Sequence, residues 1–395
     1  MTKKAVIYGL GKGFEAQKKA LEGIFEIVGV SDRKRRERED YVAPEDIHRL
    51  DFDCVYVTSL KFYEEIKREL TGCGIAGEKI LSQEGLSAYE KLQMQMTGLC
   101  ESARKAEEYQ EKNLFLNARS FAGMMRGRKI ASLEEAEFQV FSQFGEDGII
   151  QWLLHHVSIG EKTFIEFGVE DYSEANTRFL LMNNNWTGLV MDGSEENISH
   201  LNAWKYLWKY DLLTKAVFIT KENINSTIVE SGVGEGDIGL LSIDLDGNDY
   251  WILNAIDCVQ PRIVICEYNN LFGLEPVSVP YDETFVRTEK HYSNLYWGAS
   301  LGAFLKWAEK NGYYYMGSNS AGNNAFFVRK DCISAEMVPA NAHIFVESRY
   351  RESRGKGGEL TYLRGGERFA CIKDMELINV ETGRMDTIAN IYHLQ

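Results

Sequence analysis

Short apolar runs alternate with amphipathic stretches over the first part of the chain. The runs occupy residues 4–8, 25–32, 51–59 and 77–83. A glycine turn and a stretch of helical spacing, residues 9–23, separate the first two runs. Strands of a parallel sheet are covered on both faces, so they appear as continuous apolar runs. The pattern predicts a Rossmann-like α/β domain over residues 1–88.

The segment that follows, residues 89–137, has a different pattern. It contains no proline and little strand character, and its apolar side chains have helical spacing, as in Leu92, Met96, Leu99 and Ala103. We therefore predict a helical linker at 89–137.

Strand-like and helical stretches alternate again from residue 138. The apolar, β-branched runs are 163–170, 186–194, 215–223, 238–247 and 262–269. Such alternation is typical of a doubly wound parallel sheet. We predict a second Rossmann-like domain over 138–330, then a C-terminal extension at 331–395, where strand periodicity stops. The fold class is therefore α/β with two doubly wound parallel-sheet domains.

Composition and charge narrow the functional classes. The chain has 395 residues, of which 44% are hydrophobic, so each domain can bury its own core. Lysine and arginine number 44 against 59 acids, a net charge of −15 that argues against nucleic acid as a partner and favours a small molecule. No run of roughly 18 apolar residues is present, so we expect no membrane span. Seven scattered cysteines without a C-x-x-C pair favour a reducing, cytoplasmic location.

The first glycine turn resembles a dinucleotide-binding loop. Gly9, Gly11 and Phe14 have G-x-G-x-x-F spacing, and Asp32 ends the next predicted strand. In such a loop the glycines admit a pyrophosphate, and the acid binds ribose hydroxyls. Phe14 replaces the third glycine, which weakens the signal. The alternative is a purely structural turn with Asp32 solvated in a charged loop.

Acidic residues end most of the predicted strands of the central domain. They are Glu166, Asp192, Asp244, Asp246 and Glu267. The carboxyl ends of parallel strands meet at one edge of the sheet, where ligands bind. The turn after the first strand lacks basic residues, so it would repel phosphate but could hold a cationic ligand. Asp192, followed by Gly193, could accept both hydroxyls of a ribose.

Several central motifs together resemble a known family. They are FSQFGEDGIIQWLL, FIEFGVEDYSEANTRFL, GLVMDGS, LLSIDLDGNDYWIL, IVICEYNN and GNNAFFVR. Residues 138–330 are similar to the FkbM-like S-adenosylmethionine-dependent methyltransferases of the class I fold. The resemblance implies that Glu166 and Gly168 form the cofactor loop, that Asp192 and Gly193 lie at the ribose, and that Asn223 lies near the adenine. It also implies that the methionine end lies near Gln143, Glu146 and Asp147.

A second group of oxygen-bearing side chains could hold a metal. Asp244 and Asp246 are two residues apart at a strand end, and Glu267 and Asn269 repeat that spacing on the next strand. Four such groups suit octahedral Mg²⁺ or Mn²⁺, which could bind sugar oxygens. In the alternative, Asp244 binds the methionine amine or a loop amide, and Asp246 and Asp249 cap the next helix. Either Asp244 or Asp246 could also act as a general base without metal.

The acceptor side is less defined. Tyr292, Tyr296 and Trp297 are candidates for a wall against a sugar ring, and His291 is a candidate base. Arginines at 349, 351 and 354 could bind the phosphate of a nucleotide sugar, although a surface or intersubunit helix is the favoured alternative.

The first hypothesis is an S-adenosylmethionine-dependent O-methyltransferase acting on a hydroxyl of a sugar, nucleotide sugar or related metabolite, with metal assistance left open. The N-terminal unit would then serve binding or assembly, including a homo-oligomer. The alternatives are an enzyme that binds NAD or a nucleotide sugar, and a non-catalytic scaffold of polysaccharide biosynthesis.

Overall fold

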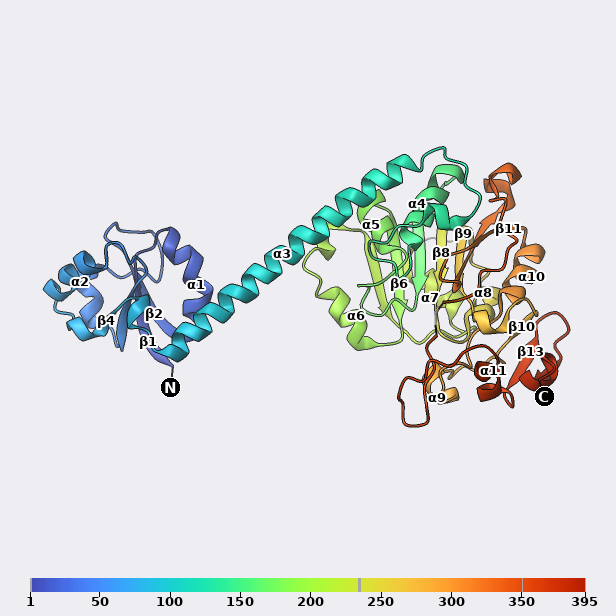
Figure 1. Cartoon of the computed structure of the whole chain (residues 1–395). Helices are drawn as coiled ribbons and strands as arrows, with labels where there is room; N and C mark the ends of the chain where they lie inside the picture. The colour runs from blue at the N-terminus through green and yellow to red at the C-terminus, as the bar shows by residue number, and fades with distance from the viewer. Residues whose placement is uncertain (1, 234–235, 350, 395) are drawn as a thin grey trace. The chain divides into compact units, whose positions relative to one another are not determined.

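The computed structural model describes residues 2–233, 236–349 and 351–394 (Figure 1). The chain forms two compact units, Met1–Asn113 and Leu114–Gln395. Each is described by itself below. Both contain parallel strands alternating with helices, which confirms the expected α/β class.

The first unit is built on a four-stranded parallel sheet. Its strands are β1 (Lys3–Tyr8), β2 (Phe25–Ser31), β3 (Cys54–Val57) and β4 (Ile80–Leu81), in the order β2-β1-β3-β4. Helices α1 (Lys12–Ile24) and α2 (Tyr63–Gly72) connect them. Phe14, which replaces the third glycine of the turn, is buried in the core.

Helix α3 (Ala88–Met124) occupies most of the expected linker. It ends close to the end of the helical pattern, at about Arg128, although the predicted linker runs on to residue 137. Met125, Ile130 and Leu133 are buried in the core of the second unit, so the chain leaves helical geometry to pack there. The second unit therefore begins before residue 138.

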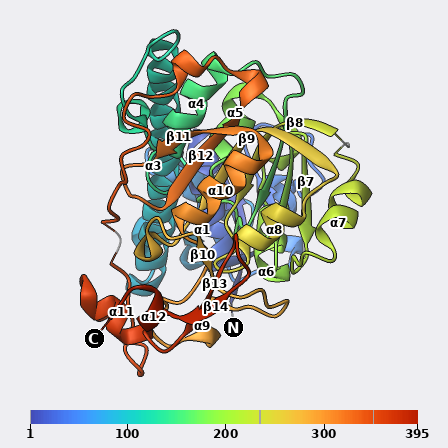
Figure 2. The same ribbon diagram turned by 90° about the vertical axis from the view of Figure 1, so that its right-hand side faces the viewer.

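The second unit contains a seven-stranded sheet in the order β11-β12-β9-β8-β5-β6-β7. The strands are β5 (Thr163–Phe167), β6 (Thr187–Asp192), β7 (Leu212–Ala216), β8 (Gly236–Ile243), β9 (Val259–Glu267), β11 (Tyr313–Ser318) and β12 (Asn324–Arg329). The five from β7 to β9 are parallel, and β12 runs antiparallel to both neighbours (Figure 2).

Helices cover both faces of this sheet, as expected of a doubly wound fold. They are α4 (Glu146–His156), α5 (Arg178–Asn184), α6 (Glu195–Asn202), α7 (Ile224–Ser231), α8 (Asp249–Ala255) and α10 (Leu301–Asn311). Phe164 and Ile165, successive residues of β5, belong to two different core clusters. Side chains of a strand alternate between faces, so each cluster lies on one face.

One strand differs from its expected position. A strand was expected at 215–223, whereas β7 ends at Ala216. Its ladder closes with the amide of Val217 donating to the Asp192 carbonyl at 2.8 Å. Beyond it, the Asn223 side chain accepts from the Thr220 amide and bends the chain into a turn. The apolar residues of 217–219 therefore belong to a loop beside the sheet edge.

The C-terminal extension is part of the second unit. Strands β10 (Val277–Ser278), β13 (Glu376–Asn379) and β14 (Met385–Thr387) form an antiparallel sheet, with α11 (Gly366–Ile372) and α12 (Ile388–Ile391) beside it (Figure 2). Leu377 and Ile388 pack in one core cluster with Phe272 and Trp297. A boundary at residue 330 is therefore not a structural one.

Two further expectations concern the whole described chain. Within the described ranges, none of the helices has the length and apolar character needed to span a membrane. All seven cysteines have free thiols.

Candidate functional site

A cavity of about 620 Å³ lies at the carboxyl ends of β5, β6, β8 and β9. The chain passes from β5 to β6 on one side and later returns to β8 on the other, so the strand order reverses at β5. Ligands of open α/β sheets bind at such a reversal. The expected site residues that line the cavity are Gln143, Glu166, Gly168, Asp192, Gly193, Asp244, Asp246, Glu267 and Asn269.

The loop after β5 is shaped by a required glycine. Gly168 has φ +71°, and a Cβ there would lie 1.5 Å from the carbonyl oxygen of Asp244. The loops after β5 and β8 can therefore touch only because residue 168 has no side chain. Glu170 and Tyr172 follow with positive φ values of 48° and 63°. Glu170 and Tyr172 thus adopt the backbone conformation that a second glycine would favour in a glycine-rich cofactor-binding loop.

Glu166 holds this loop in place. Its carboxylate accepts from the amides of Asn176 and Thr177, at 2.9 and 3.1 Å, and from the Thr177 hydroxyl. Burial raises the pKa of Glu166 to about 7, although these donors oppose the shift. Glu166 therefore fixes the loop that follows β5.

Asp192 connects two loops at the rim of the cavity. Its two oxygens accept from the amides of Glu170 and Ser194, each at 2.8 Å, and from the Asn197 side chain at 3.2 Å. A carboxylate has about four lone-pair sites, so these three donors leave one site free, on the oxygen that the Glu170 amide contacts. Asp192 can therefore accept from one ligand hydroxyl, such as a hydroxyl of a ribose.

The segment before α4 separates into one lining residue and two supporting acids. Gln143 lines the cavity. Glu146 accepts from the side-chain amides of Asn319 and Asn324, at 2.6 and 2.8 Å. Asp147 accepts from three successive amides, residues 140–142, at 2.8 to 2.9 Å. Glu146 and Asp147 are not among the described residues that form the cavity wall. Their role is therefore to hold the loop that carries Gln143.

Asn223 likewise serves the local turn. Its amide nitrogen donates to the Phe218 carbonyl at 2.9 Å, and its oxygen accepts from Thr220. It lies outside the described cavity wall, which is formed nearby by Val217, Phe218 and Ile219. These apolar residues offer a surface for a flat ring where Asn223 was expected.

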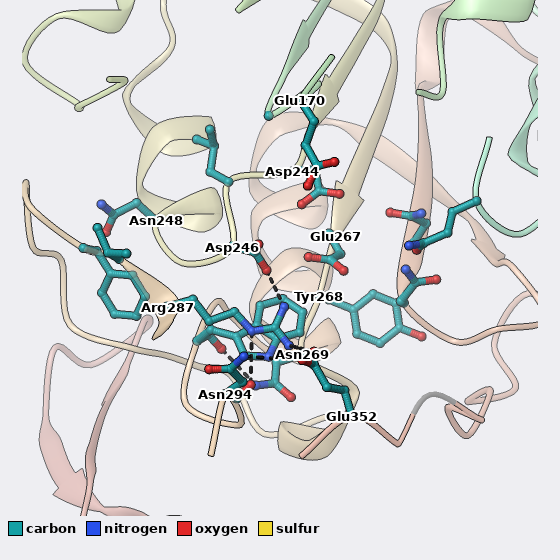
Figure 3. Close-up of a pocket in the computed structure, with 18 of the residues that line it drawn as sticks. Glu170, Asp244, Asp246, Asn248, Glu267, Tyr268, Asn269, Arg287, Asn294 and Glu352 are labelled. Carbon is teal, nitrogen blue, oxygen red and sulfur yellow. Dashed lines mark hydrogen bonds and ion pairs between the residues drawn. The ribbon is translucent and has the colours of Figure 1, made fainter. Parts of the chain in front are cut away.

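Three carboxylates converge at the ends of β8 and β9 (Figure 3). Oxygens of Asp244, Asp246 and Glu267 all lie within 4.8 Å of one another. Asp246 has a positive φ of 52°, a strained conformation that typically persists where surrounding structure enforces it. The nearby Asp249 carboxylate enforces it by accepting from the amides of Leu245 and Gly247, at 2.7 and 2.9 Å.

The electrostatics of this acidic cluster fit a cation. Burial and the neighbouring carboxylates raise the pKa values of both Asp244 and Glu267 above their usual range. One buried oxygen of Glu267 has no hydrogen-bond partner among the described residues. Carboxylate oxygens are the ligands that Mg²⁺ and Mn²⁺ prefer, so Asp244, Asp246 and Glu267 fit such an ion.

Asn269, the fourth expected ligand, is oriented differently. Its side-chain nitrogen donates to the carbonyls of Leu295 and Trp297, at 3.0 and 2.9 Å, and its oxygen accepts from the Leu271 amide. Both polar atoms of its side chain thus have backbone partners. Its contacts instead fix the segment that carries Trp297.

Two charged residues of the cavity wall, Arg287 and Glu352, are not predicted by any motif of the sequence. Arg287 belongs to the short helix α9 (Arg287–Lys290) and pairs with Asp246 at 2.5 Å and Glu352 at 3.3 Å (Figure 3). Its guanidinium lies 4.6 Å from the ring centre of Trp297. Neither residue is in a recognisable motif, and only the fold brings them together.

The remaining acceptor-side candidates are divided. Trp297 lines the cavity, whereas Tyr296 is buried with its hydroxyl donating to the Glu376 carbonyl at 2.6 Å. Tyr292 is half exposed and contacts the Cys371 sulfur. His291 bonds the Ser293 hydroxyl at 2.7 Å and lies outside the described cavity wall. The structure therefore does not bring His291 to the site.

The expected arginine cluster does not converge on the cavity. Arg349 and Arg351 are exposed, and neither belongs to the described cavity wall. Arg354 donates to Glu352 at 2.9 Å and to the Gly358 carbonyl. Arg354 therefore supports Glu352.

In the first unit, Asp32 forms hydrogen bonds within the glycine turn and the loop that follows β2. The Asp32 carboxylate accepts from the amides of Leu10 and Lys34, at 2.8 and 3.0 Å. Gly9 has φ +95°, and a Cβ there would meet the Thr58 hydroxyl at 2.8 Å. Gly11 precedes α1 and has open space around it. These contacts favour the structural alternative for Gly9 and Asp32.

Comparisons with known proteins match parts of the chain. A family model described as C2185-like, N-terminal, matches residues 1–81. No curated protein matches the chain.

Several solved structures are similar to part of the chain. One is the N-terminal domain of EvdMO1 with S-adenosylhomocysteine bound: 12% identity, TM-score 0.32, covering 55% of this chain and 94% of that one. A second is an S-adenosylmethionine-dependent methyltransferase from Clostridium acetobutylicum: 10% identity, TM-score 0.30, covering 47% and 90%. A third is TrmK from M. capricolum with S-adenosylhomocysteine: 11% identity, TM-score 0.27, covering 45% and 65%. Function must therefore be argued from the residues of the site.

Proposed function

We propose that this protein is an S-adenosylmethionine-dependent O-methyltransferase. One observation carries the proposal: the loop held by Gly168 and Asp192, suited to a nucleoside, opens into the same cavity as the carboxylates of Asp244, Asp246 and Glu267. The order of the motifs, which resembles the FkbM-like methyltransferases, also supports it. A cytoplasmic location and a small-molecule acceptor belong to the same proposal.

The cofactor would bind along the ends of β5 and β6. Asp192 would accept from a ribose hydroxyl, and Phe218 and Ile219 would contact the adenine. Burial and nearby acids raise the pKa of Glu170 on the same loop, which reflects a negative local potential. Such a potential favours the positive charge of a sulfonium over a phosphate.

The acceptor would be a hydroxyl of a sugar, a nucleotide sugar or a related metabolite. Trp297 offers an aromatic face to such a ring, and Asn294 and Asn248 add polar side chains to the wall. In the reaction the acceptor O–H bond breaks, an O–CH₃ bond forms and the S–CH₃ bond breaks. A carboxylate of the acidic cluster would take the proton.

A divalent cation would assist this step. Asp244, Asp246 and Glu267 would hold Mg²⁺ or Mn²⁺, and the ion would lower the pKa of the acceptor hydroxyl and orient it. Without the ion, Asp244 and Glu267 would share protons, as their raised pKa values indicate.

Two measurements test the proposal. Calorimetry should show binding of S-adenosylhomocysteine and none of NADH, and a folded protein that binds no S-adenosylhomocysteine would refute the methyltransferase function. Methyl transfer from labelled S-adenosylmethionine to a panel of sugars should then fall after chelation and return with Mn²⁺. Full activity after exhaustive chelation would remove the metal from the proposal while leaving methyl transfer intact.

A further inference from the structure

Arg287 occupies an unusual position within the acidic cluster. Its guanidinium lies between two carboxylates, Asp246 at the end of β8 and Glu352 in the C-terminal extension (Figure 3). Its Nε donates to the Asn294 carbonyl at 3.1 Å, and its plane lies over Trp297. The side chain is 13% exposed, so solvent screens these pairs only in part.

The segment that carries Glu352 is fixed on both sides. The Asn270 side chain donates to the Val346 carbonyl at 2.8 Å and accepts from the Ser348 amide at 3.1 Å. Farther along, the Arg354 amide donates to the Ser293 carbonyl at 3.1 Å. Of the described residues in this segment, Ser348 and Glu352 line the cavity. Glu352 is therefore a built part of the site.

Asp246 has two competing roles. It belongs to the three-carboxylate cluster that fits a divalent ion, and it is also the partner of Arg287. An arginine stays charged at any physiological pH, so it cannot reduce the repulsion from a nearby dication by losing its proton. Only a change of partner can do so. Glu352 is already in contact with the other end of the guanidinium, and it can keep the charge paired after Asp246 is released.

We propose that Arg287 is the resident counter-ion of the acidic cluster, and that it gives up Asp246 to a divalent cation while it keeps Glu352. Arg287 and Glu352 are thus positioning residues, and the C-terminal extension sets the affinity of the metal site. This inference rests on the metal site of the proposed function. It adds that the ion competes with a side chain of the protein itself.

The test is Mn²⁺ binding to the purified full-length protein without cofactor, followed by the EPR signal of the free ion. The variants are Arg287→Gln, Glu352→Gln and the double variant. Lys290→Gln is the matched control, because Lys290 lies on the same helix α9 but pairs with Asp282 outside the cavity wall. Arg287→Lys provides a second variant that keeps the charge but lacks the planar fork with which the guanidinium contacts both carboxylates. Binding of S-adenosylhomocysteine and the melting temperature check that each variant is folded.

We expect Arg287→Gln to bind Mn²⁺ about tenfold more tightly than the wild type, because a competing charge beside Asp246 is removed. Glu352→Gln should weaken binding by roughly threefold to tenfold, since Arg287 then depends on Asp246 alone, and this loss should shrink to about twofold or less in the Arg287→Gln background. Lys290→Gln should bind as the wild type does, and Arg287→Lys should bind more tightly than the wild type but less tightly than Arg287→Gln.

Three results would overturn the inference. They are unchanged or weaker binding by Arg287→Gln, equal tightening by Lys290→Gln, and an equal effect of Glu352→Gln with and without Arg287. In each case Mn²⁺ still binds, so the metal site of the proposed function survives. Absence of Mn²⁺ binding in every folded variant would instead refute both the metal site and this inference.

Discussion

The Asp192→Ala substitution tests the cofactor site most directly. Asp192 is 9% exposed, and its oxygens face the cavity between the loops that follow β5 and β6. A hydrogen bond to a charged group contributes roughly 1.5–3 kcal/mol. Loss of one such bond to a ribose hydroxyl therefore removes roughly 1.5–3 kcal/mol, which corresponds to about a tenfold to hundredfold loss of affinity.

The assay is calorimetric titration with S-adenosylhomocysteine. Asp171→Ala is the matched control, because Asp171 is an acid of the same loop whose carboxylate accepts only locally, from the Ser173 amide at 2.9 Å. This substitution removes the same charge but leaves Asp192 intact, so we expect the affinity for S-adenosylhomocysteine to change by less than about threefold. If a folded Asp192→Ala protein bound S-adenosylhomocysteine as tightly as the wild type, the ribose assignment would be wrong.

Three further predictions concern the loop, a buried acid and the C-terminal sheet. Gly168→Ala should reduce S-adenosylhomocysteine binding at least about tenfold in calorimetry, because the new Cβ would meet the Asp244 carbonyl. Gly193→Ala is the control, since its Cβ would make only an ordinary contact at 3.4 Å. Equal effects of the two substitutions would contradict the close approach of the loops after β5 and β8. Burial raises the pKa of Glu166 to about 7, above its value in the unfolded chain. The free energy of unfolding in urea should therefore contain a contribution of roughly 2–3 kcal/mol that is present below about pH 4 and is lost as the pH rises through 7. Glu166→Gln should flatten this pH dependence, and an unchanged slope would contradict the raised pKa. Leu377→Ala should lower the free energy of unfolding by roughly 2–5 kcal/mol in the same assay, because Leu377 is buried in the core. Met385→Ala, at an exposed position, should lower it by only about 0.5 kcal/mol. Similar losses would show that the extension is not part of the folded core.

The local pattern of the sequence was sufficient for the central sheet. Strands β5, β6, β8 and β9 are continuous apolar runs buried on both faces, and each brings an acid to the cavity at its end. Strand β7 was misplaced because its own residues are only partly buried, whereas the more apolar loop after it packs Ile219 against the core. An apolar run in the sequence indicates that the residues are buried, so a buried loop and a buried strand have the same pattern.

The roles of individual polar residues were harder to predict. Asp192, Asp244 and Glu267 face the cavity because they end strands, which a period-two pattern can locate. Whether Asn269 or Asp147 faces a ligand or a backbone amide depends on loop geometry, and the structure shows backbone partners for both. Arg287 and Glu352 meet through contacts far apart in the chain, and no local pattern encodes them.

The small sheet of the extension has a consequence for how the site forms. Val277 pairs with Asn379, so β10 can pair only once the chain has been made as far as β13. Long-range pairings of this kind form slowly, because the loop between them must be closed first. The cofactor side, built from β5, β6 and β8, is complete earlier in the chain, by Asp244. During synthesis a chain long enough to bind the nucleoside would still lack the wall that carries Glu352, so cofactor binding would precede the ability to select an acceptor.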